Sequence, residues 1–263
     1  MISKSGLQRL ANREKIGLGI LEKDYVLNEV LEGLSLVPQL NELLVFKGGT
    51  ALRKAYFPDW RYSEDLDFTA KWNISQEELS HFLDRWYKEV EEASQVRLFT
   101  KMLYKPNGYA RVRSQFFGPL NHPGLIFFDI SFDEPLCLEP EHRKVLVDPF
   151  QSKNRKILVY PLEEILAEKL RSLLERGKAR DYYDVWRLLK EKSTMFDTEI
   201  LKEVFYKKIT HKNIQFNGLD SFILKDREIL ERYWMNELGH QINQLPLLVE
   251  VLSELPSMLA NIF

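Results

Sequence analysis

The fold is decided by two neighbouring segments, Phe46-Lys47-Gly48-Gly49-Thr50 and Arg61-Tyr62-Ser63-Glu64-Asp65-Leu66-Asp67-Phe68. The first has the pattern of an apolar strand that runs into a glycine pair. The second has the pattern of a strand in which two carboxylates alternate with apolar residues. Because residues i and i+2 of a strand point to the same face, we expect Asp65 and Asp67 to project together while the apolar residues face the core.

These two segments combine groups that suit different parts of a nucleotide. Two carboxylates about 4 Å apart repel by roughly 1 kcal/mol in water and roughly 4 kcal/mol at an effective dielectric near 20. A cation normally offsets such repulsion, and paired carboxylate oxygens suit Mg²⁺. Beside them, Gly48 and Gly49 can expose successive backbone N–H groups in a concavity that suits phosphate. A glycine pair alone is usually a turn, so it is the order of the two motifs that indicates nucleotide chemistry.

A third carboxylate lies in a later apolar run, Gly124–Phe132, where Asp129 occupies the middle of a predicted strand. Central strand positions rarely carry an unpaired charge, because removing its water costs several kcal/mol. Asp129 therefore either completes the acidic cluster or pairs with a nearby arginine such as Arg111 or Arg113. We favour the acidic cluster.

Composition limits the class of protein. The chain has 263 residues, 44% hydrophobic and 29% charged, which is ordinary for a soluble globular protein of one large or two small domains. A net charge of −2 argues against a general nucleic-acid coat. Any RNA contact would come from local basic clusters, each of which is more often a solvated face. The clusters are Lys101/Lys105 with Arg111/Arg113, Lys153/Arg155/Lys156, and Lys207/Lys208/Lys212.

Cellular location follows from what the sequence does not contain. Cys137 is the only cysteine, which excludes an intrachain disulfide and a cysteine-based zinc site. Residues 1–18 carry charges throughout and lack an apolar signal core. No run approaches the eighteen or so apolar residues of a membrane helix. We expect a cytoplasmic protein without a membrane partner.

The character of the chain changes near residue 160. Before it, helical patterns at about 16–34, 51–56 and 75–93 are interleaved with strand patterns at 43–46, 109–117 and 125–132, the last two predicted to pair antiparallel. Beyond it, only helical patterns occur, at about 162–176, 181–190 and 199–206 and through much of Phe222–Leu259.

Lys169 stands out in the first of these later helices. At 3.6 residues per turn it falls inside the apolar stripe, between Ile165 and Leu173, so it must snorkel, pair or hold a ligand. Asp181 shares a face of the next helix with apolar residues. One interpretation is a structural Lys169–Asp181 salt bridge between packed helices. The other is a lysine ammonium that meets a nucleoside triphosphate. Both can hold, with the bridge orienting the lysine.

The glycine pair followed by Asp-x-Asp resembles the signature of DNA polymerase β-like nucleotidyltransferases. The chain also resembles a narrower group, the AbiEii/AbiGii nucleotidyltransferase toxins, through segments that occur in this order: Glu22-Lys23-Asp24-Tyr25-Val26-Leu27, Gly48-Gly49-Thr50-Ala51-Leu52, Arg61–Phe68, Glu168-Lys169-Leu170 and Arg180-Asp181-Tyr182-Tyr183-Asp184. The resemblance implies an α+β protein. Residues 1–160 would form a polymerase β-like nucleotidyltransferase domain with a mixed sheet, and residues 161–263 an α-helical domain.

The resemblance also implies a function: a toxin of a toxin–antitoxin or abortive-infection system that transfers a nucleotide from an NTP. In similar toxins the acceptor is tRNA, and a cognate antitoxin is encoded beside the toxin. Catalysis would depend on Mg²⁺, held by Asp65, Asp67 and Asp129, with Asp129 also a candidate to activate the acceptor hydroxyl. Phosphate contacts would come from Gly48, Gly49, Thr50 and Ser63. Lys169 would stabilise charge on the triphosphate, and Asp181 would orient it.

Two other functions remain open. The chain could be a nucleotide- or RNA-binding module with a silent active site, although a binding-only site has less need of clustered carboxylates. It could also transfer the nucleotide to a protein hydroxyl rather than to RNA.

Overall fold

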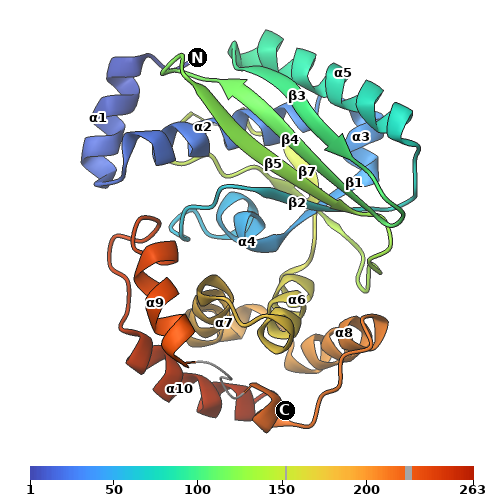
Figure 1. The fold of residues 1–263 in the computed structure, drawn as a ribbon, viewed down its shortest axis with the longest axis vertical. Coiled ribbons are helices and arrows are strands. Elements are labelled where there is room, and N and C mark those ends of the chain that lie inside the picture. The colour runs from blue at the N-terminus through green and yellow to red at the C-terminus, as the bar shows by residue number, and fades with distance from the viewer. Residues whose placement is uncertain (152, 223–226) are drawn as a thin grey trace. The chain divides into compact units, whose positions relative to one another are not determined.

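The computed structural model describes residues 1–151, 153–222 and 227–263, and these form two compact units (Figure 1). Unit 1 comprises Met1–Leu136 and Pro140–Tyr160, and unit 2 comprises Cys137–Glu139 and Pro161–Phe263.

Unit 1 is built from helices and one sheet. Its helices are α1 (Lys4–Glu14), α2 (Leu18–Leu34), α3 (Pro38–Leu43), α4 (Gly48–Ala51), which continues as a π-helical turn (Leu52–Tyr56), and α5 (Gln76–Ser94). Its strands are β1 (Leu44–Lys47), β2 (Leu66–Ala70), β3 (Arg97–Tyr104), β4 (Tyr109–Phe117), β5 (Pro123–Ser131), β6 (Glu141–Lys144) and β7 (Lys156–Val159).

The strands of the described residues form a seven-stranded sheet in the order β3-β4-β5-β2-β1-β7-β6. The pairs β2/β5 and β1/β7 are parallel and the others are antiparallel, so the mixed sheet and the α+β class are confirmed. The antiparallel pairing predicted for residues 109–117 and 125–132 is also confirmed, as β4 and β5.

One face of the sheet is buried. Alternate residues of β2 and β5, such as Phe68 and Phe128, are fully buried, and both rings pack against Trp86 of α5. Helix α5 begins at Ser75 with a capping box, in which the Ser75 hydroxyl accepts from the Glu78 N–H and the Glu78 carboxylate accepts from the Ser75 N–H. On the other face, Asp67 of β2 and the intervening residues of β5, which include Asp129, are only half-buried.

Unit 2 contains α6 (Leu162–Glu175), α7 (Ala179–Glu191), α8 (Thr198–His211), α9 (Arg227–Leu238) and α10 (Leu248–Ala260), with short 3₁₀ turns at Ser193–Met195 and Leu219–Phe222. The helical pattern predicted within Phe222–Leu259 corresponds to α9 and α10, and residues 223–226 of that prediction lie outside the described residues. Among the helices that the structure describes, none has both the length and the apolar character that a membrane span requires.

A fully buried ion pair ties the helices of unit 2 together. Lys208 Nζ of α8 lies 2.8 Å from Glu164 Oε1 of α6, and neither side chain is exposed to solvent. Glu164 also accepts from the backbone N–H groups of Cys137 and Leu138, which attaches that short segment to unit 2. The basic cluster predicted around Lys208 as a possible RNA contact therefore loses this residue, because its charge is already used inside the unit.

Candidate active site in unit 1

The chain turns sharply from β1 into α4 at Gly48, which adopts a φ of +79°. A Cβ at this position would lie 2.3 Å from Oδ2 of Asp67. Only glycine therefore satisfies both the left-handed backbone and the close approach. The glycine turn and the Asp67 carboxylate, which the sequence places 19 residues apart, are in direct contact.

Asp67 lies beside Asp129. The two residues are Cα partners in the parallel β2/β5 ladder, so their side chains leave the same face of the sheet on neighbouring strands. Leu66 and Phe68, on either side of Asp67, are fully buried, as the alternation predicts. Asp65 comes just before β2 begins and is half-buried.

Asp129 also has partners on β4. The Tyr109 hydroxyl donates to Asp129 Oδ1, and Arg111 Nε lies 3.6 Å from the same oxygen. Burial, together with the hydrogen bond and negative charge of Asp129, raises the pKa of the Tyr109 phenol. The arginine pairing that the sequence left open is thus present, with a tyrosine that the sequence did not indicate.

Within the described ranges, no three His, Cys, Asp or Glu side chains converge closely enough to form a ready-made metal site. The structure brings Asp67 and Asp129 together by strand register, whereas the assignment of Asp65, Asp67 and Asp129 as a shared metal-binding set stays a prediction.

Thr50 connects the glycine turn to the loop before β2. Its buried Oγ1 lies 2.7 Å from Ser63 Oγ and 2.5 Å from the carbonyl oxygen of Asp65, within donor reach of both. The two hydroxyls predicted to contact phosphate are therefore adjacent to each other and to the first aspartate. Gly49 is buried within α4, between Gly48 and Thr50.

Helix α2 supports the same loop through Lys23, whose role could not be inferred from spacing. Lys23 Nζ lies 2.8 Å from Glu64 Oε2, in the residue that precedes Asp65. Both side chains are partly exposed, so this pair fixes position more than it adds stability.

The neighbouring Asp24 holds the helical segment that follows the glycines. Its buried Oδ1 lies 2.6 Å from Lys54 Nζ and 3.2 Å from Arg53 Nε. Burial lowers the pKa of Lys54 to about 8, although the Asp24 charge acts in the opposite direction. Arg53 also donates to the carbonyl oxygens of Pro58 and Trp60, at 2.7 and 2.6 Å. The Asp24 carboxylate thus holds two cationic side chains of the segment that follows the glycine turn.

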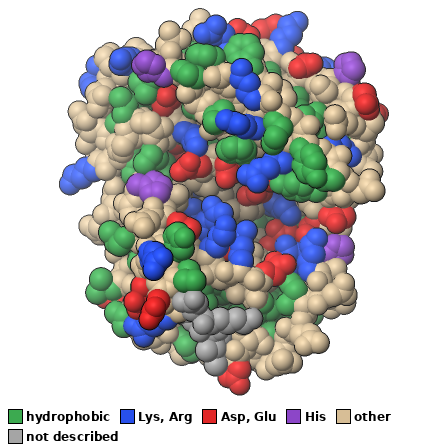
Figure 2. Space-filling view, in the orientation of Figure 1, with side chains coloured by type: hydrophobic (Ala, Val, Ile, Leu, Met, Phe, Trp, Pro, Cys, Tyr) green, Lys and Arg blue, Asp and Glu red, His purple; other side chains and the backbone are tan. Residues whose placement is uncertain are grey.

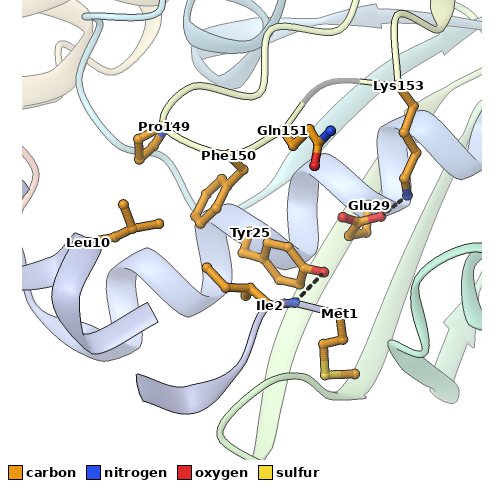
Figure 3. A pocket seen from close by; sticks show the side chains of 9 residues that line it. All are labelled: Met1, Ile2, Leu10, Tyr25, Glu29, Pro149, Phe150, Gln151 and Lys153. Carbon is orange, nitrogen blue, oxygen red and sulfur yellow. Dashed lines mark hydrogen bonds and ion pairs between the residues drawn. The ribbon is translucent and has the colours of Figure 1, made fainter. Parts of the chain in front are cut away.

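Unit 1 also has a cavity that is separate from the predicted site residues. It has a volume of about 610 Å³ and is lined by the N-terminal residues, by α2 and by the segment around Phe150 (Figure 3). Lys153, from the second predicted basic cluster, pairs there with Glu29, and the Ile2 N–H donates to the Tyr25 hydroxyl at 3.4 Å (Figure 3). None of the predicted site residues lines this cavity.

In unit 2, Lys169 lies in a buried acidic cluster. Its Nζ is 3.1 Å from Asp181 Oδ1 and 2.9 Å from Asp184 Oδ2, and both carboxylates are fully buried. Arg176 Nε lies 3.0 Å from Asp181 Oδ2. Burial by itself raises the pKa of Asp181, but the charges and hydrogen bonds of Lys169 and Arg176 outweigh burial and hold the pKa below its ordinary value.

The Lys169–Asp181 bridge between packed helices is therefore present, and Asp184 is a second partner. Asp184 appeared in the sequence only as the last residue of the Arg180–Asp184 motif, and its direct contact with Lys169 follows from how α6 and α7 pack.

Solved structures share this fold. MenT4, a nucleotidyltransferase toxin from Mycobacterium tuberculosis, matches with a TM-score of 0.73 and 18% sequence identity, over 99% of this chain and 89% of MenT4. JHP933 from Helicobacter pylori matches with a TM-score of 0.58 and 20% identity, over 94% of this chain and 93% of JHP933. No curated protein matches the sequence.

A family model provides the assignment that these distant structural likenesses cannot. The model described as the nucleotidyl transferase AbiEii toxin of a type IV toxin–antitoxin system matches residues 29–256, which is most of the chain. The resemblance inferred from the motifs is thereby confirmed. The chain belongs to the AbiEii family of nucleotidyltransferase toxins of type IV toxin–antitoxin systems and is a nucleotidyltransferase.

Proposed function

We propose that the glycine turn and the Asp67/Asp129 pair form the centre of a Mg²⁺-dependent nucleotidyl transfer from an NTP to an RNA acceptor, with tRNA as the first candidate. The observation that carries the proposal is the contact of the Gly48 turn with Asp67, which itself pairs in register with Asp129. A phosphate-binding turn and a carboxylate pair must meet in this way if both are to act on one triphosphate.

The carboxylates fit a divalent cation by their chemistry. Asp67 and Asp129 supply oxygen ligands from neighbouring strands on one face, and Asp65 comes two residues before Asp67 in the chain. Oxygen donors of this kind suit Mg²⁺, which neutralises charge on phosphates when it is bound.

Backbone N–H groups, hydroxyls and a carboxylate of the protein would bind the phosphates and accept the proton of the acceptor hydroxyl. Backbone N–H groups of Gly48 and Gly49, at the first turn of a helical segment, have no partner inside the helix and can donate to phosphate oxygens. The hydroxyls of Thr50 and Ser63 lie beside them. The acceptor hydroxyl oxygen forms a bond to the α-phosphorus, the bond to pyrophosphate breaks, and the hydroxyl proton passes to a carboxylate, for which Asp129 is our candidate.

We propose that Lys169 stabilises charge on the triphosphate and that Asp181 orients the lysine. Their contact at 3.1 Å supports the orienting role. Residues 1–160 would then be the nucleotidyltransferase domain and residues 161–263 the α-helical domain. We place the protein in the cytoplasm, where NTPs and RNA are available, together with the antitoxin that the family implies.

The test uses the purified full chain with each of the four NTPs, labelled at the α-phosphate. Each is incubated with Mg²⁺ and with a small-RNA fraction that contains tRNA, an RNA-free protein extract, or no acceptor. We expect label to appear on RNA with at least one nucleotide and to disappear when EDTA removes Mg²⁺. Label on protein alone would favour protein nucleotidylation. Nucleotide binding without transfer to either acceptor would indicate a silent module.

A further inference from the structure

We propose that the uncovered face of strands β3, β4 and β5 binds a single-stranded nucleic acid and leads it to the Asp67/Asp129 pair. We call this surface the open face and define it by Phe99, Tyr104, Arg111, Arg113, Phe117 and Phe127. The inference deepens the proposed function, because it assigns a binding surface to the acceptor.

The open face follows from the alternation of β4. Ala110, Val112 and Ser114 are fully buried on the side that α5 covers, whereas Arg111 and Arg113 between them are exposed. Figure 2 shows Lys and Arg side chains lying among hydrophobic ones over the strands. The sheet therefore presents a mixed basic and apolar surface to solvent rather than the polar surface usual for an uncovered antiparallel sheet.

Aromatic rings are unusually exposed on β3, one of the two edge strands of the described sheet. Phe99 is 46% exposed and Tyr104 is 59% exposed. The Phe99 ring also meets the Phe117 ring of β4 edge to face, with centroids 6.1 Å apart. Exposed rings on a strand surface give successive bases a stacking platform whatever the base, because every base has a π-face.

Arginines lie directly on this platform. The Arg111 guanidinium is 5.0 Å from the centre of the Phe127 ring, and the Arg97 guanidinium is 5.1 Å from the centre of the Phe117 ring. Arg113 is exposed opposite Phe127 in the ladder. Rings that stack and guanidinium groups that attract phosphate are the two components of single-strand binding surfaces. This local positive charge contrasts with the net charge of −2 of the whole chain.

Strand register connects the open face to the acidic pair. Tyr104 is the Cα partner of Arg111, Arg111 of Asp129, and Asp129 of Asp67. The row crosses four adjacent strands, a span of roughly 14 Å at the usual strand spacing. A single-stranded nucleic acid with a base stacked on Tyr104 could therefore reach the carboxylates along one straight row of the sheet.

The test measures binding without nucleotide, so that it does not depend on catalysis. A fluorescent 12-nucleotide single-stranded RNA of mixed sequence, the same sequence as DNA, and an RNA duplex are titrated with the full chain. We expect the single strands to bind more tightly than the duplex. Comparison of the RNA and DNA titrations shows which of the two nucleic acids the surface prefers. Phe99→Ala and Tyr104→Ala should each weaken single-strand binding roughly tenfold. Arg113→Gln should weaken it and reduce the slope of log affinity against log salt by about 0.7.

Matched controls lie away from the open face. Tyr233→Ala removes an exposed ring from α9, and Arg85→Gln removes an exposed charge from α5; neither should change binding. Asp67→Asn should keep single-strand binding even if it abolishes transfer, which separates this inference from the proposed function. Single strands that bind no better than the duplex would overturn it. So would unchanged binding by Phe99→Ala and Tyr104→Ala, because the single strand would then bind away from the open face.

Discussion

Gly48 lies so close to Asp67 that any side chain at position 48 would collide with the carboxylate: a Cβ would be 2.3 Å from Oδ2 and 3.0 Å from Cγ. The φ of +79° disfavours every other residue type as well. The close contact between the backbone turn and the Asp67 carboxylate therefore depends on the absence of a side chain at position 48.

Gly48→Ala should push the glycine turn and the Asp67 carboxylate apart. We expect transfer activity to fall by more than a hundredfold and the free energy of unfolding to fall by roughly 1–3 kcal/mol, the usual cost of a left-handed non-glycine residue. Urea unfolding and the labelled-nucleotide assay measure the two effects. Gly19→Ala is the matched control: it lies in α2 with no atom within 4 Å of the new Cβ, so stability should rise by about 0.5–1 kcal/mol. Normal activity of Gly48→Ala would show that the close approach has no catalytic role.

Lys169→Met should damage stability as well as activity. The substitution removes the ammonium group that lies within 3.1 Å of two fully buried carboxylates, Asp181 and Asp184, and Arg176 remains close to the first. Removing one member of a buried charge cluster costs about 3–5 kcal/mol. We expect Asp184→Asn in the same chain to recover part of this loss, because it removes one of the two buried carboxylate charges that Lys169 contacts. Chemical denaturation of the single and double variants measures it.

Stability alone does not reveal whether Lys169 meets the triphosphate. Lys169→Arg keeps a cation in the cluster while changing its shape, so it should be much more stable than Lys169→Met. If the lysine serves the nucleotide, Lys169→Arg should still lose roughly a hundredfold in turnover. A well-folded Lys169→Arg protein with full turnover would leave this residue with a structural role only.

Lys54 predicts a specific pH dependence. Burial lowers its pKa from 10.5 to about 8 in the folded protein, so the unfolded chain binds more protons between these two values. The contribution of Lys54 to the free energy of unfolding therefore rises as pH increases from about 8 towards 10.5. In Lys54→Met this titration is absent. The stability of the parent chain minus that of the variant should increase over this range, as urea unfolding at several pH values would show. A constant difference would mean that Lys54 titrates normally.

Local patterns in the sequence predicted the parts of the fold that depend on near neighbours. The alternation around Asp67 predicted which residues are buried, and Ser75 marked the beginning of α5. Strand β3 was not predicted, because most of its residues are exposed and a bulge between Thr100 and Met102 interrupts its alternation. An edge strand with both faces partly exposed lacks the periodic burial from which strands are recognised.

The site required contacts that sequence distance conceals. Lys23 meets Glu64 across 41 positions, and Tyr109 reaches Asp129 only because the β4/β5 register brings their side chains together. Such contacts depend on register and helix packing, which composition and periodicity do not determine. The motifs identified the aspartates and Lys169 as candidates, whereas the groups that hold them in place became visible only in three dimensions.

Asp67→Asn shows whether nucleotidyl transfer requires the carboxylate beside the glycine turn. The substitution keeps the size of the side chain and removes its charge, so folding should be preserved while transfer of labelled nucleotide falls at least a thousandfold. Asp84→Asn, which neutralises an exposed carboxylate on α5, should transfer at the parent rate. If Asp67→Asn folds normally and transfers nucleotide as fast as Asp84→Asn, the Asp67 carboxylate has no part in nucleotidyl transfer.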